Sequence, residues 1–270
     1  EKMARGLVTA GGGGGNILHA PYAYQMGMFL MPAEYAMQAH RHMAEYGSTP
    51  EQFAQVAVKS HKNALKNPYA QYQVDMSLDD VLNDVMIADP ITRCMCSPST
   101  DGASAVVICA NEVAHKYKGK PVTIAGWASG TPEYNPTAVG DDVADDFVTR
   151  VANEAYYLAG VTPDQVKVGQ VHDAFAPGEV FAIEALGFCE KGKGAQFVWE
   201  GGADIDGEHP VNTDGGLESR GHPMGATGIA QMIEIVRQLR GEAGERQVPG
   251  DFDHGICHNM GVGGLNVTIL

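Results

Sequence analysis

The feature that most constrains the fold is an alternation of strand-like and helical segments that begins near residue 101. A buried strand is predicted by DGASAVVICA (101–110) and a second strand by PVTIAGWASG (121–130), with the helical ANEVAHKY between them. Residues 141–159 then place apolar side chains at helical spacing, at positions 143, 147, 148, 151, 155 and 158, and stop before Gly160. Such an alternation predicts an α/β protein.

The alternation continues to the end of the chain. TPDQVKVGQV predicts a turn followed by a strand, which delivers His172 and Asp173 at its carboxyl end. APGEVFAIEALG predicts a helix with Pro177 at its first position and Gly187 at its end. GHPMGATG opens another helix, and DFDHGIC forms a strand before a glycine loop and the final strand. Ends of strands in α/β sheets are where ligands bind, so we expect the functional residues there.

The first 88 residues are mostly helical and rich in aromatic side chains. MPAEYAMQAHRHMAEYG predicts a helix that ends at Gly47, and the next segment predicts a helix with Thr49 as N-cap and Pro50 at its first position. Apolar positions at 53, 56, 57 and 58 give that helix a buried face. We expect this part to be a helical insertion or lid.

Composition narrows the class of protein. The 18 basic and 33 acidic residues give a formal charge of −15, which argues against nucleic acid or an anionic membrane surface as the main partner. We find no apolar run long enough to span a membrane and no signal peptide, so we expect a cytoplasmic protein without membrane insertion. The five cysteines lack disulfide spacing, and Cys94–Met95–Cys96 is not a metal-binding pair, so no metal site is predicted.

Three candidate reactive side chains stand where strands or loops meet helices or tight turns: His172, His222 and Cys257. Each also has a structural interpretation. His172 could be a hydrogen-bonded core histidine with Asp173 capping the next helix, and Cys257 could be a small buried apolar side chain. The glycines around His222 instead predict a tight backbone path toward a helix N-terminus, where backbone amides can hold an anion.

The residues after Cys257 are candidates for shaping a site. Gly261 and Gly263 follow in a glycine loop whose backbone N–H groups could face a developing oxyanion. His258 and Asn259 lie between, and one of them could orient the thiol while the other packs.

Several blocks together resemble a known family. GGLESRGHPMGATGIAQ resembles the Gly-His-Pro block of thiolases, and VHDAFAPGE resembles the His-Asp-x-Phe block of the sterol-carrier-protein-type thiolases. LRGEAGERQVPG followed by CHNMGVGG is similar to the C-terminal segment of that group, and the likeness extends upstream through NPYAQYQ and STDGASAVVICA. It therefore covers nearly the whole chain.

The resemblance implies a layered α/β/α/β/α thiolase fold. Residues 1–4 would end the N-terminal half, 5–88 would form the loop domain, 89–120 would complete the N-terminal half and 121–270 would form the C-terminal half. In thiolases the nucleophilic cysteine lies in a block upstream of the segment that matches Glu1. No cysteine of this chain occupies that block, so we expect the nucleophile outside it.

The resemblance also implies the chemistry, which is acyl transfer from a coenzyme A thioester without a further cofactor. His222 would take the proton of the nucleophile and help to hold a thioester oxygen, and His172 would contribute to the oxyanion site. Relatives carry a second acid/base cysteine after His-Asp, where this chain has Ala174. We therefore expect Cys257 to be the relocated acid/base, with a pKa shifted modestly below the usual value of about 8.5.

Residues that would contact the substrate are harder to identify. Ser219 and Arg220 are candidate neighbours of an anionic ligand, or ordinary surface residues. The aromatic and methionine side chains that could line an acyl tunnel, or else belong to the core, are Phe175, Met224, Tyr22, Tyr24 and Phe29.

Two other functions stay open. A steroid side-chain retro-aldolase shares the fold, but that group resembles the family with tyrosine at the position of His172 and an altered Gly-His-Pro loop, and here both are intact. A non-catalytic thiolase-like subunit or scaffold would explain the missing nucleophile. The resemblance further implies a homodimer or homotetramer and a possible OB-fold partner of the DUF35 type that carries CoA thioesters.

Overall fold

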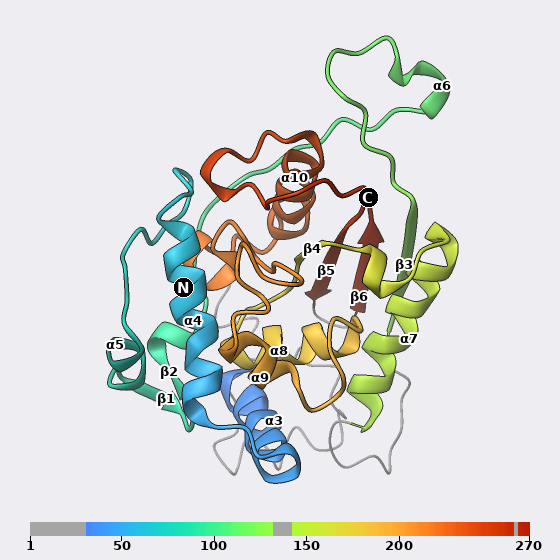
Figure 1. The fold of residues 1–270 in the computed structure, drawn as a ribbon. Coiled ribbons are helices and arrows are strands. Elements are labelled where there is room, and N and C mark those ends of the chain that lie inside the picture. The colour runs from blue at the N-terminus through green and yellow to red at the C-terminus, as the bar shows by residue number, and fades with distance from the viewer. Residues whose placement is uncertain (1–30, 132–141, 262–263) are drawn as a thin grey trace.

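A computed structural model describes residues 31–131, 142–261 and 264–270 (Figure 1). Four residues singled out in the sequence lie outside these ranges, so their predicted roles are not addressed further: Tyr22, Tyr24, Phe29 and Gly263.

Two long helices open the described part of the chain, as predicted. Helix α3 (Met31–Tyr46) ends at Gly47, which has a φ of +75°. Helix α4 (Pro50–Ala64) begins after Thr49, which forms a capping box with Gln52. The short elements that follow are α5 (Leu78–Leu82), the antiparallel pair β1 (Met86–Ala88) and β2 (Ile91–Thr92), a 3₁₀ turn (Arg93–Met95) and α6 (Asn111–Ala114).

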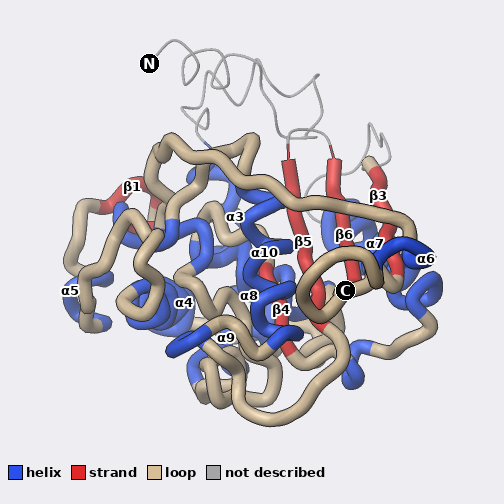
Figure 2. The backbone as a smooth tube through the Cα atoms, turned by 90° about the horizontal axis from the view of Figure 1, so that it is seen from above, coloured by secondary structure: helices blue, strands red, loops and turns tan. Residues whose placement is uncertain are grey.

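A four-stranded sheet forms the centre of the second half. Its strands are β3 (Gly126–Gly130), β4 (Val168–Gln170), β5 (Gly255–Gly261) and β6 (Gly264–Ile269), in the order β3-β6-β5-β4. Strand β4 runs parallel to β5, with Gln170 opposite Cys257, and the other neighbours are antiparallel. Figure 2 shows β5, β6 and β3 side by side.

Helices cover both faces of this sheet. Residues of α7 (Asp142–Ala159) and α8 (Ala176–Ala185) pack on the face that carries Ile256, Val267 and Ile269. Helix α10 (Thr227–Arg240) packs on the opposite face, which carries Val168 and Cys257 (Figure 1). The predicted α/β class is therefore confirmed. Helix α9 (Gly194–Trp199) and a π-turn (Gly216–Arg220) complete the set, with 3₁₀ turns at Pro163–Gln165 and Gly244–Arg246.

Some details of the prediction were wrong. Residues 101–110 form no regular structure, and Val107 and Ile108 are 89% and 69% exposed. An apolar run becomes a strand only beside another strand, and none of the described strands pairs with it. The strand expected to begin at residue 121 begins at Gly126. Leu158, expected on the apolar face of its helix, is exposed. Pro177, expected as the first residue of its helix, is the second residue of α8, after Ala176.

A buried ion pair connects α4 to α8. Lys59 Nζ lies 2.9 Å from Glu179 Oε1 and donates a hydrogen bond of 2.7 Å to the carbonyl of Val211. The segment predicted to be a lid is thus packed firmly against the C-terminal part of the chain. The domain boundaries at residues 4, 88 and 120 stay a prediction.

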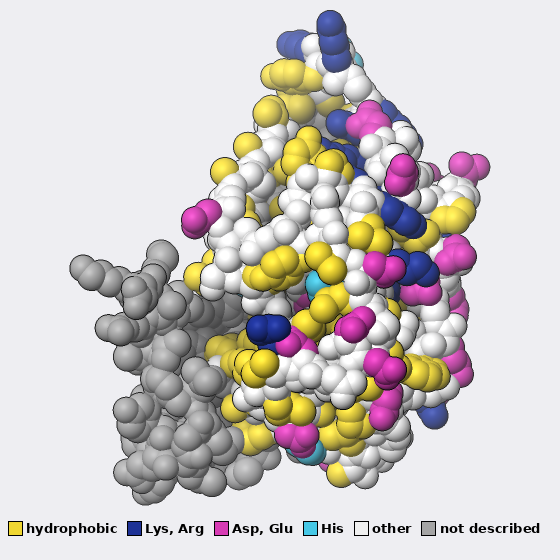
Figure 3. Space-filling view, turned by 90° about the vertical axis from the view of Figure 1, so that its left-hand side faces the viewer, with side chains coloured by type: hydrophobic (Ala, Val, Ile, Leu, Met, Phe, Trp, Pro, Cys, Tyr) yellow, Lys and Arg dark blue, Asp and Glu magenta, His cyan; other side chains and the backbone are white. Residues whose placement is uncertain are grey.

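The structure also bears on surface charge, on membrane-spanning helices and on clusters of metal ligands. On the face drawn in Figure 3, acidic side chains are spread among basic and hydrophobic ones, in keeping with the net charge of −15. Within the described ranges, none of the helices has the length and apolar character needed to cross a membrane, and no three His, Cys, Asp or Glu side chains are grouped as metal ligands.

Candidate active site

The parallel pairing of β4 and β5 brings two histidines together. The chain leaves β4 and reaches His172, whose backbone N–H donates a hydrogen bond of 3.3 Å to Nδ1 of His258 in the middle of β5. A backbone N–H can only donate, so Nδ1 of His258 is unprotonated and its neutral ring carries the proton on Nε2. That Nε2 atom is buried and has no hydrogen-bond partner among the described residues.

His222 lies against His172. The two rings meet edge-on, with centroids 5.0 Å apart and an interplanar angle of 86°. The backbone N–H of His222 donates to Thr100 Oγ1 at 3.2 Å, and Ser99 pairs with His222 in a parallel bridge. A Cβ on Gly221, which has a φ of +111°, would lie 2.8 Å from Thr100 Oγ1, so both the conformation and the contact favour glycine before His222.

The electrostatics of the site keep all three imidazoles neutral near pH 7. Burial, together with the neighbouring His222, His258 and Arg220, lowers the pKa of His172 to about 3. Burial, together with the Arg220 charge, lowers the pKa of His222 to about 4, and burial lowers the pKa of His258 to about 4. Neutral imidazoles can accept a proton at one nitrogen and donate from the other, so the group can act in acid/base chemistry and can stabilise an oxyanion.

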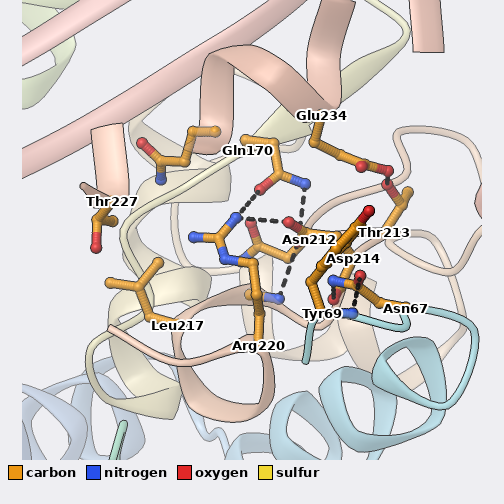
Figure 4. A network of polar contacts seen from close by, with 12 residues as sticks. Asn67, Tyr69, Gln170, Asn212, Thr213, Asp214, Leu217, Arg220, Thr227 and Glu234 are labelled. Atoms are coloured by element: carbon orange, nitrogen blue, oxygen red, sulfur yellow. Dashed lines mark hydrogen bonds and ion pairs between the residues drawn. The ribbon is translucent and has the colours of Figure 1, made fainter. Parts of the chain in front are cut away.

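Arg220 is held by an internal network instead of facing solvent. Its Nη1 donates to Asp214 Oδ2, and Gln170 Nε2 donates to the other oxygen of the same carboxylate at 3.2 Å (Figure 4). Ser219 is fully buried, and its Oγ has no hydrogen-bond partner among the described residues. The alternative that Ser219 and Arg220 are ordinary surface residues is therefore wrong, while their contact with an anionic ligand stays a prediction.

Asp173 does not cap α8, contrary to the alternative considered from the sequence. Its Oδ1 accepts the backbone N–H of Leu217 at 2.8 Å, so it holds the π-turn that leads to His222. The side chains of Asp173, Glu179 and Glu218 are all buried, and Lys59 is the cation paired with Glu179. Burial raises the pKa of Asp173 to about 7 and raises that of Glu218 well above its usual range, which the neighbouring Asp173 charge reinforces.

Cys257 points away from the face that carries His258, because successive residues of a strand face opposite sides. Its side chain is 4% exposed and packs in an apolar cluster with Val168, Ile235 and Leu239. Burial raises the pKa of the thiol, so the expected downward shift is wrong. The acid/base role of Cys257 stays a prediction, but these surroundings favour packing. Asn259, two residues on, donates to Gln231 Oε1 of α10 at 3.1 Å.

The other predicted site residues differ in their surroundings. Phe175 precedes α8, and its ring contacts that of Tyr35 of α3 in a tilted arrangement, with centroids 4.9 Å apart, while Met224 is 55% exposed. Gly261 is exposed at the end of β5. The carbonyl of Ala174 accepts the backbone N–H of Ser97 at 2.9 Å, so this position contributes backbone only.

Sequence reasoning missed the residues that hold the histidines. Thr100 binds the backbone of His222, and Thr227 contacts its ring, with Oγ1 at 2.7 Å from Nδ1. The spacing of five residues between His222 and Thr227, at the start of a helix, is a signal that could have been used. No local signal reveals Thr100, because it lies 122 residues from its partner.

Comparison with known proteins shows the family of the chain. Residues 135–270, half of the chain, match the family model described as thiolase C-terminal domain-like. The chain is 45% identical over 232 residues to an acetyl-CoA acetyltransferase of Methanothermobacter thermautotrophicus, a match that covers 85% of this chain and 60% of that protein. It is 38% identical over 246 residues to sterol carrier protein 2 of Oryctolagus cuniculus, covering 89% of this chain and 45% of that protein.

A solved structure gives the same result for the fold. The Ltp2-ChsH2(DUF35) aldolase superposes with a TM-score of 0.79 at 28% identity, covering 94% of this chain and 68% of that chain. The chain thus spans about half the length of the curated relatives it matches. The predicted fold type is confirmed, and the chain belongs to the thiolase family.

Proposed function

We propose that the protein containing this chain is a thiolase-type acyltransferase that acts on coenzyme A thioesters. The reaction would be thiolytic cleavage of a 3-ketoacyl-CoA or, in reverse, Claisen condensation of acetyl-CoA. The observation that carries the proposal is the contact of His172 with both His222 and His258, all three neutral, beside strands β4 and β5. The relationship to the acetyl-CoA acetyltransferase supports it.

Each histidine would have a separate task. The nucleophile would be a cysteine that lies outside the given sequence. His222 accepts the proton of its thiol, which leaves the attacking thiolate, because a neutral, partly buried imidazole offers a free lone pair. His172, 5.0 Å away, helps to hold the thioester oxygen as negative charge develops on it. His258 acts as a support that fixes the backbone of His172 through its Nδ1. Cys257 is not assigned a step.

A second candidate is a retro-aldolase, which one observation favours: the superposition on the Ltp2-ChsH2(DUF35) aldolase. Retro-aldol cleavage of a 3-hydroxyacyl-CoA gives an acyl-CoA and a carbonyl compound and needs neither a cysteine nor free CoA. The intact His172 and His222 speak for the transferase, because acyl transfer needs a base for the nucleophile and donors for two oxyanions.

Partners and assembly belong to the same proposal. A DUF35 OB-fold partner is supported by the complex in the matched aldolase structure. A homodimer or homotetramer is proposed from family resemblance alone, and a cytoplasmic location is proposed from the sequence features given above. A non-catalytic thiolase-like subunit stays an alternative, because none of the cysteines in this chain occupies the nucleophile block.

The reaction class is tested with the intact protein and two substrates. Acetoacetyl-CoA with free CoA should give two acetyl-CoA per turnover, while a 3-hydroxyacyl-CoA without free CoA should remain uncleaved. His222→Ala should lose the first activity, and His115→Ala, at an exposed position, should keep it. Cleavage of the 3-hydroxyacyl-CoA alone would identify an aldolase, and the absence of both activities with and without a DUF35 partner would favour the non-catalytic subunit.

A further inference from the structure

Thr227 is the one side chain whose hydroxyl is hydrogen-bonded to the ring of His222 among the described residues. Its Oγ1 lies 2.7 Å from Nδ1 of His222 and donates at 3.1 Å to the carbonyl of Pro223. Thr227 is the first residue of α10 and is 1% exposed, so water does not compete for either contact. The contact is therefore fixed by the start of the helix.

The single hydrogen of the Thr227 hydroxyl decides the direction of its hydrogen bond with Nδ1 of His222. A threonine hydroxyl has one hydrogen to donate and two lone pairs to accept with. Thr227 is the first residue of α10, and its hydroxyl lies within donating distance of the carbonyl four residues earlier, that of Pro223. With that hydrogen on the Pro223 carbonyl, the oxygen accepts from the ring and Nδ1 of His222 carries the proton; with the hydrogen on Nδ1, the ring is the opposite tautomer.

We propose that Thr227 is a positioning residue that holds His222 as the Nδ1–H tautomer and leaves Nε2 free as the base. This inference rests on the proposed function for its consequence, but the tautomer itself does not depend on any reaction. The opposite tautomer would present an N–H at Nε2 to the nucleophile and could not take its proton.

The same contact serves the ring after it has accepted a proton. Imidazolium has N–H groups on both nitrogens, and Nδ1–H keeps its acceptor in Thr227 Oγ1 without any rearrangement. The hydrogen bond from the backbone N–H of His222 to Thr100 Oγ1 holds the backbone of this residue, so the ring turns little between its neutral and protonated states. Thr227 thus supports the protonated state through which acylation passes.

Nitrogen-15 NMR of the histidine-labelled intact protein tests the proposal directly. Long-range proton–nitrogen correlations at pH 7.5 distinguish protonated from unprotonated ring nitrogens, and His222→Gln identifies the signals of His222. We expect Nδ1 protonated and Nε2 unprotonated in the wild type. A wild-type His222 with the proton on Nε2 would overturn the proposal.

Three variants separate the effect of the Thr227 hydroxyl from the effect of the shape of its side chain. Thr227→Val keeps the volume and removes the hydroxyl, so it should lose the tautomer preference and slow acylation at least about 10-fold, by the usual effect of removing a partner that orients a histidine. Thr227→Ser should retain both. Thr100→Val removes the contacts of the Thr100 hydroxyl to the His222 backbone and to Gln71 but none to the His222 ring, so it should leave the tautomer unchanged.

The outcomes keep the two proposals apart. If Thr227→Val shows the wild-type tautomer, Thr227 does not position the ring, whatever the activity. If neither wild type nor variants accept an acyl group but the tautomer responds as expected, the proposed function fails and the role of Thr227 in holding the ring stands.

Discussion

Substitution of Cys257 decides whether this side chain belongs to the chemistry or to the core. The structure packs the thiol, 4% exposed, among Val168, Ile235 and Leu239 between the sheet and α10. Cys257→Ala removes one buried sulfur and leaves a small cavity, and a buried group of that size contributes about 1 kcal/mol before the cavity cost is added. We therefore expect the free energy of unfolding to fall by about 1–2 kcal/mol.

Cys257→Ser sharpens the test. It keeps the shape but places a hydroxyl in apolar surroundings, and a buried hydroxyl without a partner costs about 1–3 kcal/mol. Serine should thus be at least as destabilising as alanine. Cys109→Ala, in the irregular segment 101–110, is the control and should change the free energy of unfolding by less than about 0.5 kcal/mol.

Two assays on the intact protein read the outcome. Urea denaturation gives the free energies of unfolding, and mass spectrometry follows deuterium exchange at the α-carbon of bound acetyl-CoA. We expect Cys257→Ala to exchange deuterium within a few-fold of wild type. If exchange is lost while stability is unchanged, the packing argument fails and Cys257 is the acid/base that the sequence suggested.

Further predictions concern buried charges. Lys59→Met should lower the free energy of unfolding by about 3–5 kcal/mol in urea denaturation, because it leaves the carboxyl of Glu179 buried without its cation, whereas Lys62→Met at an exposed position should change it little. Burial raises the pKa of Glu218, so its ionisation destabilises the fold increasingly as the pH rises above about 4.3, the pKa in the unfolded chain. The free energy of unfolding of Glu218→Gln should therefore increasingly exceed that of the wild type from pH 5 to pH 8. The exposed control Glu112→Gln should show no such gain. Burial lowers the pKa of His172 to about 3 and of His222 to about 4, so the stability these rings confer is present above about pH 6.5 and is lost as the pH falls toward 4; replacing both by Asn should flatten this part of the stability profile.

Local signals predicted much of the fold correctly. The N-cap Thr49 with Pro50, and the glycine stop at Gly47, act through the backbone of a few neighbouring residues, so the sequence alone placed α3 and α4. The strand before His172 and the helix after the Gly-His-Pro block followed from the same short-range patterns.

Features that depend on distant partners could not be predicted in this way. Residues 101–110 are apolar enough for a strand, but strand formation needs a neighbouring strand, which local sequence does not supply. The spacing of Cys257 and His258 shows that they face opposite sides of a strand, yet not which side meets the site. The ion pair of Lys59 with Glu179 joins residues 120 positions apart, and nothing near either residue announces it.

The rate of acyl transfer to the intact protein is the most direct test of the proposed function. Single-turnover labelling with a radioactive acyl-CoA should form a thioester in the wild type and in His115→Ala at similar rates. His222→Ala should slow this step by at least about 10²-fold, the lower end of a general-base effect. Labelling of His222→Ala at the wild-type rate would contradict the assignment of His222 as the base and, with it, the mechanism proposed for this site.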